Sequence, residues 1–361
     1  MKNSNAIAIV SSSLGHGGAE RFASLLGTML HQLGYEVHHI IIKDIVAYDY
    51  KGQLLNLGKL VPPSSFGSIP LQKGRHIARY LKQHNIDTII DIRSRPMLLR
   101  ELFTKIIYGK RRVFFMIHSS NLEMYLPKSV FWAKFLYQKA AKLVFVSREI
   151  EAKAKAQYGF TNTQTIYNPI VFPDKVYDKP ADAPAQYFIF FGRLEDAIKN
   201  ISLLVEAFSL SEAKEKNYQL LLVGDGTDKE RIAQKIREVK AETYIKILPF
   251  QNPIVPYIQH ARATLLTSYF EGFPMSLVES LAAGTPVISV DCETGPREIV
   301  QHLRNGLLVP NHNVQAVTEA INQMITDDYL YQTCKNNAQK SVEHLSLDTI
   351  TQHWQQLVKQ A

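Results

Sequence analysis

Short apolar runs rich in β-branched residues alternate with longer amphipathic stretches along this chain. Such alternation is typical of strand–helix units on parallel sheets. In the first half the predicted strands are residues 6–10, 36–42, 87–91, 112–117 and 142–147. In the second half they are residues 187–192, 218–224, 244–248, 263–267, 285–290 and 306–310. The pattern predicts an α/β protein with two sheets.

Residues 167–186 are rich in proline and charged side chains, which is the composition of a linker. At 361 residues, the chain also exceeds what one hydrophobic core organises well. We therefore expect a first domain at 1–172, a second at 173–345, and an amphipathic C-terminal helix at 346–361 that packs back towards the first. Two doubly wound, Rossmann-like domains facing each other would form a cleft between the carboxyl ends of their strands, where ligands bind.

The composition is that of an ordinary globular protein, with 46% apolar and 20% charged residues. No apolar run approaches the roughly 20 residues that span a bilayer, and the first residues turn polar too early for a signal peptide. A cytoplasmic location is therefore expected. Cys292 and Cys334 are too few for a disulfide framework or a cysteine-held metal, so we expect no metal and buried thiols.

The net charge of +8 is unevenly distributed. Residues 1–172 carry 23 Lys and Arg against 10 Asp and Glu, whereas the remainder carries 18 against 23. This asymmetry indicates that the first half faces an anionic partner.

A glycine-rich turn follows the first predicted strand, with Gly15, Gly17 and Gly18 before a helix. Such a turn lets the backbone approach an anion at the helix amino end. The third glycine of a dinucleotide-binding motif is replaced by Glu20, so the nicotinamide alternative rests only on Asp44 after the second strand. An ordinary tight turn is the other alternative.

Three further side chains lie where ligand contacts are expected. His118 directly follows the strand at 112–117, at the carboxyl end of the sheet. Arg193 follows the strand at 187–192 and Lys199 precedes the next helix, so both cations can converge on a diphosphate. Solvated surface charges and a loop histidine are the structural alternatives. A second glycine turn, "VGDG", ends at a helix for which Asp228 is the expected N-cap.

Two glutamates frame a helix start in "FEGFPMSLVESLAAGTPVISV". Glu271 lies in the turn before Pro274, which suits the first helical position. Glu279 lies on the helix among apolar residues, so simple solvent exposure is less expected for it. The pair can hold two separate hydroxyl-bearing parts of one elongated ligand, with an anion at the backbone N–H groups between them.

The ordered set "GGAER", "FGRL" with "KN", "VGDG", "EGFPMSLVESLAAGTPVIS", "GPREIV" and "NGLLV" resembles the retaining nucleotide-sugar glycosyltransferases of family 4, which have the GT-B fold. The resemblance implies that Arg193 and Lys199 bind the donor diphosphate, Glu279 the ribose and Glu271 the donor sugar. It implies that His118 lies near the reacting sugar and makes His118, Arg193, Lys199 and Glu271 the catalytic set. The implied donor-binding residues are Gly17, Gly18, Gly192, Arg193, Lys199, Gly224, Glu271, Gly272, Phe273, Pro274, Met275, Ser276, Leu277 and Glu279.

The implied reaction moves a hexose or N-acetylhexosamine from a nucleoside-diphosphate sugar with retained configuration, UDP-sugar being the first expectation and GDP-mannose the second. Cations aimed at the leaving diphosphate stabilise charge that grows in the transition state. No Asp-x-Asp triplet is present, so no metal or other cofactor is expected. A nucleotide-sugar epimerase of the same fold and a non-catalytic nucleotide-sugar sensor are the alternatives.

Basic residues of the first half gather at 93–112 and 128–142, and the second segment mixes lysines with aromatic residues. This mixture predicts a helix at an anionic membrane surface, and a core-facing helix with solvated lysines is the alternative. No recognised nucleic-acid module is present. We therefore expect a peripheral enzyme on the inner face of the cell membrane, acting on a lipid-linked or lipopolysaccharide-type glycan acceptor.

Overall fold

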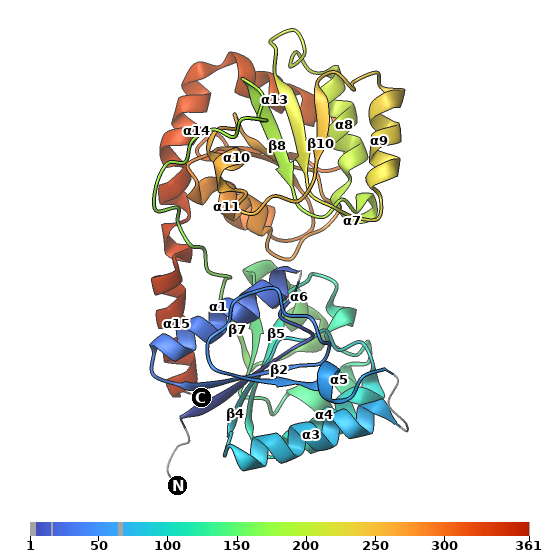
Figure 1. Cartoon of the computed structure of the whole chain (residues 1–361), viewed down its shortest axis with the longest axis vertical. Coiled ribbons are helices and arrows are strands. Elements are labelled where there is room, and N and C mark those ends of the chain that lie inside the picture. The colour runs from blue at the N-terminus through green and yellow to red at the C-terminus, as the bar shows by residue number, and fades with distance from the viewer. Residues whose placement is uncertain (1–4, 16, 64–67, 361) are drawn as a thin grey trace. The chain divides into compact units, whose positions relative to one another are not determined.

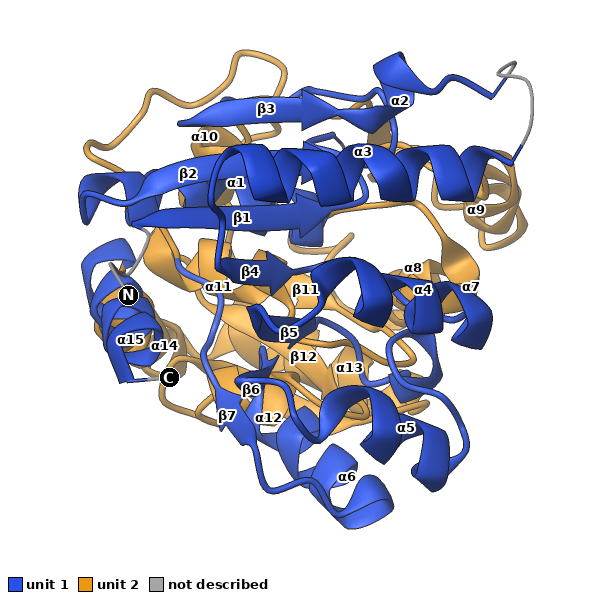
Figure 2. Ribbon diagram, turned by 90° about the horizontal axis from the view of Figure 1, so that it is seen from below, with its two compact units in different colours: residues 1–169, 347–361 blue, residues 170–346 orange. Residues whose placement is uncertain are grey.

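A computed structural model describes residues 5–15, 17–63 and 68–360. The chain divides into two compact units, which Figure 2 draws in different colours. Unit 1 contains Met1–Pro169 and Leu347–Ala361, and unit 2 contains Ile170–Ser346. The C-terminal helix α15 (Leu347–Gln360) therefore belongs to unit 1.

Unit 1 (Figure 1) is built on a parallel sheet whose strand order, labelled in Figure 2, is β3-β2-β1-β4-β5-β6-β7. Its strands are β1 (Ala6–Ser11), β2 (Glu36–Ile41), β3 (Gln53–Asn56), β4 (Thr88–Asp91), β5 (Arg112–Ile117), β6 (Lys142–Phe145) and β7 (Thr163–Thr165). The described helices of this unit besides α15 are α1 (Gly18–Gln32), α2 (Leu57–Leu60), α3 (Ile69–Gln83), α4 (Leu98–Tyr108), η1 (Leu122–Met124), α5 (Val130–Tyr137) and α6 (Arg148–Tyr158).

Unit 2 repeats this architecture with the parallel strand order β10-β9-β8-β11-β12-β13. Its strands are β8 (Tyr187–Phe191), β9 (Gln219–Val223), β10 (Ile245–Leu248), β11 (Thr264–Leu266), β12 (Val287–Asp291) and β13 (Gly306–Pro310). Its helices are α7 (Asp196–Lys199), α8 (Ile201–Leu210), α9 (Lys229–Glu238), α10 (Val255–Gln259), α11 (Met275–Ala282), α12 (Pro296–Ile299), α13 (Val314–Thr326), α14 (Asp328–Ser341) and η2 (Glu343–Leu345).

Central strands of both sheets are almost entirely buried, because helices cover both faces of a doubly wound sheet. All six residues of β1 are buried, as are four of the five residues of β8. This explains why near-continuous apolar runs, rather than alternating ones, marked these strands in the sequence. The prediction of two Rossmann-like α/β sheets is confirmed.

Two strands were not predicted. β3 and β7 lie at the two edges of the first sheet, and their sequences are "QLLN" and "TQT". An edge strand is held by one neighbour and is partly solvated, so it needs no long apolar run. Helix boundaries also differ slightly: Pro274 is the N-cap of α11, not its first residue.

The strand orders place a topological switch point in each unit. In unit 2 the order reverses between β8 and β11, and in unit 1 between β1 and β4. Loops that leave these strands at the carboxyl end diverge and open a crevice for ligands. Among the described residues, none of the helices is both long and apolar enough to cross a membrane.

Candidate functional site

The switch point of unit 2 is lined by the loops that follow β8 and β11. The first loop carries Gly192 and Arg193 and leads to Lys199 at the end of α7. The second carries Ser268, Glu271 and the turn before α11. The parallel topology thus brings together two segments that are about 70 residues apart in the sequence.

Lys199 and Glu271 form an ion pair across these two loops. The Nζ atom of Lys199 lies 2.7 Å from Oε1 of Glu271, and both side chains are largely buried. The hydroxyl of Ser268 donates to the same oxygen at 2.6 Å. A carboxylate with two donors on one oxygen is held in a fixed orientation and keeps its second oxygen for another partner.

The backbone around Glu271 is fixed as well. Thr294 Oγ1 donates to the Glu271 carbonyl at 2.5 Å, and the Glu271 N–H donates to the Glu293 carbonyl at 3.3 Å. Gly295, which follows Thr294, has a φ of +96°, and an added Cβ would lie 2.6 Å from Pro274 Cδ. The loop after β12 therefore supports the turn that carries Glu271.

The short helix α7 is clamped so that Lys199 has a defined position. The Asp196 carboxylate accepts from the backbone N–H and the hydroxyl of Ser202, each at 2.7 Å. Thr267 Oγ1 donates to the carbonyls of Lys199 and Asn200, at 3.2 Å and 3.0 Å. Asn200 itself adopts a left-handed conformation with φ 49°, which turns the chain from α7 into α8.

Asp228 stands at the N-cap of α9 as predicted, but its side chain does not cap that helix. Its Oδ2 instead accepts from the backbone N–H of Asp196 at 2.7 Å. The "VGDG" segment therefore helps to position α7, and with it Lys199.

Arg193 is arranged differently from Lys199. Its side chain is 65% exposed, and its guanidinium lies 3.0 Å from Glu195 Oε1. The two cations are thus bound to different carboxylates. The predicted convergence of Arg193 and Lys199 on a diphosphate requires Arg193 to exchange Glu195 for the ligand.

Gly192 and Gly224 end neighbouring strands and pack directly against each other. Gly224 has a φ of +149°, and an added Cβ would lie 1.9 Å from the Gly192 carbonyl oxygen. This contact alone requires glycine at position 224. Donor binding by Gly192 and Gly224 stays a prediction.

The helix α11 presents one partly open face. Met275, Ser276 and Glu279 are half-buried, whereas the other five residues of this eight-residue helix are buried. Residues at these spacings share a side of the helix. Pro274 at the N-cap has no hydrogen-bonding side chain, and no acidic residue lies in the first turn. The amino end of α11 therefore offers its positive dipole end to an anion.

The remaining predicted donor-binding residues lie in the turn before α11 or on it. Gly272 is half-buried, whereas Phe273, Pro274 and Leu277 are buried, so Leu277 reaches a ligand only through its backbone.

In unit 1, Gly17 is the N-cap of α1 and Gly18 is its first residue. An added Cβ at Gly17 would collide with the Glu20 carboxylate, so a negative group covers this helix end. Asp44 accepts from Asn56 Nδ2 at 2.6 Å. These contacts disfavour the nicotinamide alternative.

His118 is half-buried directly after β5, and its ring lies 5.2 Å from that of Phe22. Its Nε2 atom has no hydrogen-bond partner among the described residues. Burial, assisted by the positive charge of Arg95, lowers the pKa of His118 to about 3. A neutral imidazole at physiological pH is suited to hydrogen bonding with a sugar hydroxyl rather than to pairing with a charge.

A buried polar cluster follows β4 and was not predicted. Asp91 accepts from Arg93 Nε at 3.0 Å and from the Tyr108 hydroxyl at 2.8 Å. The Arg95 guanidinium donates to the Arg93 carbonyl at 2.7 Å and lies 4.9 Å from the Phe115 ring centre. Although burial raises the pKa of Asp91, Arg93 and Arg95 lower it overall, so the carboxylate stays charged.

This cluster corrects the interpretation of residues 93–112 as a basic surface. Arg95 is buried and the Arg93 side chain is only 11% exposed, and the Asp91 carboxylate offsets one of their two charges, so these two arginines contribute little to the basic exterior. The only signal in the sequence that could have indicated burial of these arginines is the neighbouring Asp91, which ends an apolar strand.

Two family models match the chain: Glycosyltransferase Family 4 over residues 16–171, and Glycosyl transferases group 1 over residues 174–341. The N-acetylgalactosamine-N,N'-diacetylbacillosaminyl-diphospho-undecaprenol 4-alpha-N-acetylgalactosaminyltransferase of Campylobacter jejuni is 26% identical over 341 residues, which cover 90% of this chain and 92% of that protein. The lipopolysaccharide 1,6-galactosyltransferase of Escherichia coli is 34% identical over 168 residues, or 45% of this chain and 46% of that protein.

Among solved structures, Anabaena HepE in complex with UDP and glucose superposes with a TM-score of 0.79 at 19% sequence identity. The match covers 99% of this chain and all of that one. Together the two family models account for nearly the whole sequence, one for each half. The chain therefore belongs to the glycosyltransferases of family 4 and has the GT-B fold of two Rossmann-like units.

Proposed function

We propose that this protein is a retaining glycosyltransferase that moves a hexose or N-acetylhexosamine from a UDP-sugar to a lipid-linked or cell-surface glycan acceptor. GDP-mannose is the second candidate donor. The observation that carries the proposal is the Lys199–Glu271 ion pair at the switch point of unit 2. It supplies one fixed cation and one fixed carboxylate where a doubly wound sheet binds its ligand.

Donor binding replaces this ion pair with two better-matched contacts. The diphosphate binds Lys199 and replaces Glu195 as the partner of Arg193, while the Glu271 carboxylate accepts hydrogen bonds from hydroxyls of the donor sugar. The ribose hydroxyls bind to Glu279, and the amino end of α11 contributes backbone N–H groups. Because the Lys199–Glu271 pair is largely shielded from water, exchanging one partner for a dianionic diphosphate is favourable.

The reaction breaks the bond between the anomeric carbon and the diphosphate oxygen, and the leaving nucleotide keeps the electron pair. Lys199 and Arg193 stabilise the charge that grows on this oxygen. The acceptor hydroxyl attacks from the face that the diphosphate leaves, and its proton passes to the departing phosphate. This order of events retains the anomeric configuration. The cations perform the role that a metal has in other transferases, so added metal is not required.

The acceptor class is inferred from the relatives. One is named for transfer to a diphospho-undecaprenol-linked sugar and another for transfer to lipopolysaccharide. Both names describe transfer of a galactose-type sugar, and HepE was solved with UDP and glucose, which supports a UDP-sugar here. An epimerase of the same fold is not favoured, because these relatives are transferases that use an acceptor.

The acceptor is proposed to be reached at an anionic membrane surface. Large apolar side chains of α4 and α5 are exposed, and the most exposed of them are here called the α4–α5 surface, namely Leu99, Phe103, Ile106, Phe131 and Phe135. Leu99, Phe103 and Ile106 form a single stripe at helical spacing, although an exposed helix face is normally polar. Lys105 Nζ donates to the Phe135 carbonyl at 3.0 Å and so joins the two helices.

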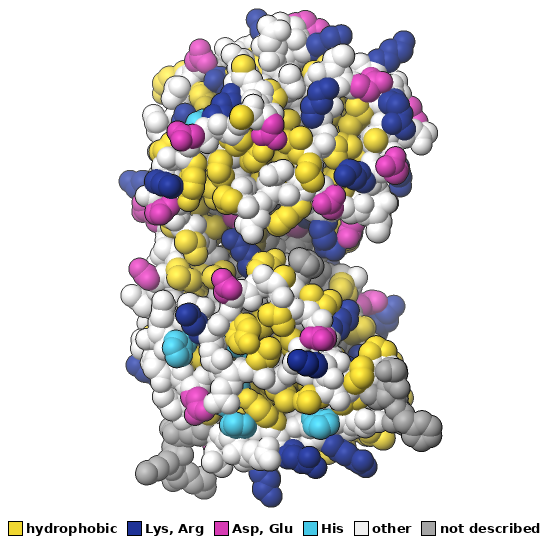
Figure 3. All heavy atoms as spheres, viewed as in Figure 1, with side chains coloured by type: hydrophobic (Ala, Val, Ile, Leu, Met, Phe, Trp, Pro, Cys, Tyr) yellow, Lys and Arg dark blue, Asp and Glu magenta, His cyan; other side chains and the backbone are white. Residues whose placement is uncertain are grey.

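Exposed cations surround this apolar surface, including Arg100, Lys110, Lys134 and Lys139. An apolar stripe flanked by lysines is the composition of surfaces that insert between anionic headgroups. On the face drawn in Figure 3, Lys and Arg also gather along the edge of unit 1 where Figure 1 draws α3, whereas unit 2 carries both signs.

The proposed function is tested by release of the nucleoside diphosphate, UDP from a panel of UDP-sugars or GDP from GDP-mannose, with and without diphospho-polyprenol glycans. We expect release that depends on one donor and on an acceptor, with unchanged initial rates in EDTA. Nuclear magnetic resonance of the product should show the anomeric configuration of the donor. Conversion of the donor without any acceptor would instead identify an epimerase, and inversion would refute the mechanism.

A further inference from the structure

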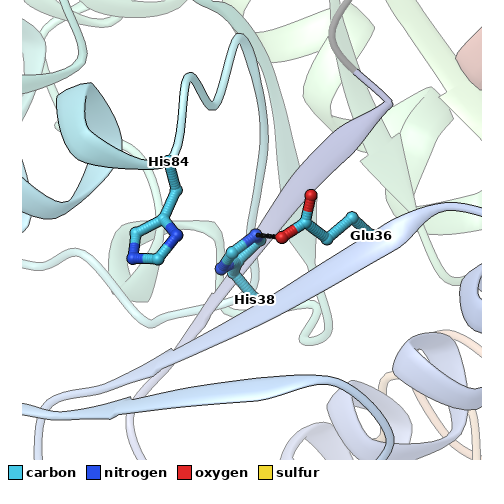
Figure 4. A group of neighbouring side chains, drawn as sticks. All are labelled: Glu36, His38 and His84. Carbon is cyan, nitrogen blue, oxygen red and sulfur yellow. Dashed lines mark ion pairs between the residues drawn. The ribbon is translucent and has the colours of Figure 1, made fainter.

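Three potential metal ligands meet at the amino end of β2 in unit 1. Glu36, His38 and His84 each offer one ligand atom, and these atoms all lie within 4.8 Å of one another (Figure 4). The first two come from β2 and the third directly follows α3. This end of the parallel sheet is opposite the carboxyl ends of its strands, where His118 lies.

Regular secondary structure explains why these residues converge. Glu36 and His38 are two residues apart on a strand, so both side chains point to the same face of the sheet. Tyr80 and His84 are four residues apart at the end of α3 and so share one side of that helix. The Tyr80 and His84 rings lie 4.2 Å apart, and the His38 and His84 rings 4.8 Å apart.

The fully buried His38 is oriented as metal-binding histidines usually are. Its Nδ1 is 3.0 Å from the Tyr80 hydroxyl, which leaves Nε2 directed at Glu36. A hydrogen bond to the second ring nitrogen fixes the tautomer and orientation of a ligating imidazole. Gln53 also orients Glu36, because its Nε2 donates a hydrogen bond to Glu36 Oε1 at 3.1 Å.

The present contact between His38 and Glu36 is poorly satisfied. Nε2 of His38 lies 3.1 Å from Glu36 Oε1, yet the contact is not aligned as a hydrogen bond.

We propose that Glu36, His38 and His84 bind a divalent transition-metal ion of the zinc class. Two imidazole nitrogens and one carboxylate form an established zinc donor set, with water as a fourth ligand. Zinc–ligand bonds of about 2.0–2.2 Å require the three atoms to approach one another more closely than the 4.8 Å limit seen here. Glu36 is exposed and His84 is half-buried at a helix end, so both have room for this movement.

The bound ion would join β2 to the end of α3 and would stabilise unit 1 without taking part in sugar transfer. This inference goes beyond the proposed function and does not depend on it. The sequence did not reveal the site, because expectations about metals rested on cysteine and on Asp-x-Asp motifs, and His84 is separated from His38 by a helix.

The test is zinc binding to the untagged full chain after chelator treatment and dialysis, followed by calorimetry and by thermal unfolding. We expect one zinc ion per chain and a higher melting temperature with zinc. His84→Ala and Glu36→Gln should each weaken binding by at least about tenfold, as loss of a ligand or its support does. Both positions reach solvent, so the variants should fold, and the zinc-free melting curve checks this.

His76→Ala is the matched control, because His76 lies on the same helix but outside the cluster. It should bind zinc like the unchanged protein and gain the same thermal stability. Equal binding by the His84→Ala and His76→Ala variants would assign the ion to other histidines and overturn the proposal. So would the absence of stoichiometric zinc binding by the unchanged protein.

Discussion

At the scale of single residues, the contacts of Glu271 determine how Lys199 is presented to a ligand. Its carboxylate holds Lys199 at 2.7 Å and accepts from Ser268, so the lysine is already in place but is neutralised. The phosphate of a ligand must therefore compete with Glu271 for Lys199. Because of this competition, binding of the nucleotide part of the donor and transfer of its sugar part can be measured separately.

Substitution Glu271→Gln should separate nucleotide binding from transfer. Glutamine keeps the size and the contact with Ser268 but no longer neutralises Lys199, so UDP alone should bind as tightly as before or more tightly. Transfer should fall by about tenfold or more, because the sugar loses a charged acceptor of its hydroxyls. Calorimetry with UDP and initial rates measure the two effects. A parallel loss of UDP affinity would show that Glu271 only positions Lys199.

Buried histidines make stability depend on pH. Burial, partly offset by a hydrogen bond to the Lys51 carbonyl, lowers the pKa of His39 to about 4. Between an unfolded-state pKa of about 6.5 and this value, only the unfolded chain takes up a proton. Stability is therefore fully present above about pH 6.5 and falls as the pH decreases, by up to about 1.4 kcal/mol per pH unit for one histidine.

Urea unfolding of the unchanged protein and of His39→Gln at several values between pH 7 and pH 4.5 measures this contribution. The variant should lose stability less steeply on acidification. Parallel pH profiles for the two proteins would contradict the assignment.

Sequence reasoning identified Lys199 and Glu271 separately but not their contact. The two residues come from different loops, and only the strand order β9-β8-β11 brings these loops together. The Asp91–Arg93–Arg95 cluster was missed for a related reason. Arginines between two predicted elements are usually solvated, and burial depends on how the whole unit packs.

At the scale of elements, the glycine turns after β8 and β9 determine where the loop that carries Arg193 lies. Gly224 has positive φ and almost no room for a side chain beside Gly192. Gly284, after α11, also has positive φ, at +83°, but no atom lies within 4 Å of an added Cβ. The two positions thus separate backbone strain from steric overlap.

Gly224→Ala should destabilise the protein by at least about 2 kcal/mol more than Gly284→Ala does, because only the first adds a clash to the strain of a non-glycine residue at positive φ. The free energy of unfolding in urea measures both. Equal losses for the two variants would mean that the loop shifts to accommodate a side chain.

The α4–α5 surface should control attachment to vesicles. Combined Ile106→Ser and Phe131→Ser substitutions should weaken binding to phosphatidylglycerol vesicles by at least about tenfold, because each buried apolar side chain contributes roughly 1.5–3 kcal/mol. Binding should also weaken with salt. The control exchanges Val176 and Tyr329, equally exposed in unit 2, for serine. Equal binding by both double variants would contradict a membrane role for α4 and α5.

The sequence predicted the interior strands well, because their apolar runs reflect burial on both faces. It predicted less about α5, whose apolar residues were thought to face either the core or a membrane. The structure places Ala133, Leu136 and Tyr137 in the core and leaves Phe131 and Phe135 exposed. Both faces of this helix are apolar, so periodicity alone did not distinguish them.

At the scale of the whole molecule, two Rossmann-like units carry different parts of the chemistry. Unit 2 contains the residues proposed to bind the diphosphate and the nucleotide. Unit 1 contains His118, the α4–α5 surface and most of the excess positive charge. The last helix, α15, contributes Trp354 to unit 1, and its ring lies 6.1 Å from that of Phe22.

The rate of acceptor-dependent UDP release by Lys199→Ala, compared with Lys229→Ala, tests the central claim most directly. Lys229 is the matched control, because it is an exposed lysine of unit 2 paired with Asp225 at 3.5 Å. Loss of a cation that stabilises the leaving diphosphate should lower the rate of Lys199→Ala by about 10²–10³-fold, with Lys229→Ala unchanged. Near-normal turnover by a folded Lys199→Ala protein would contradict the account.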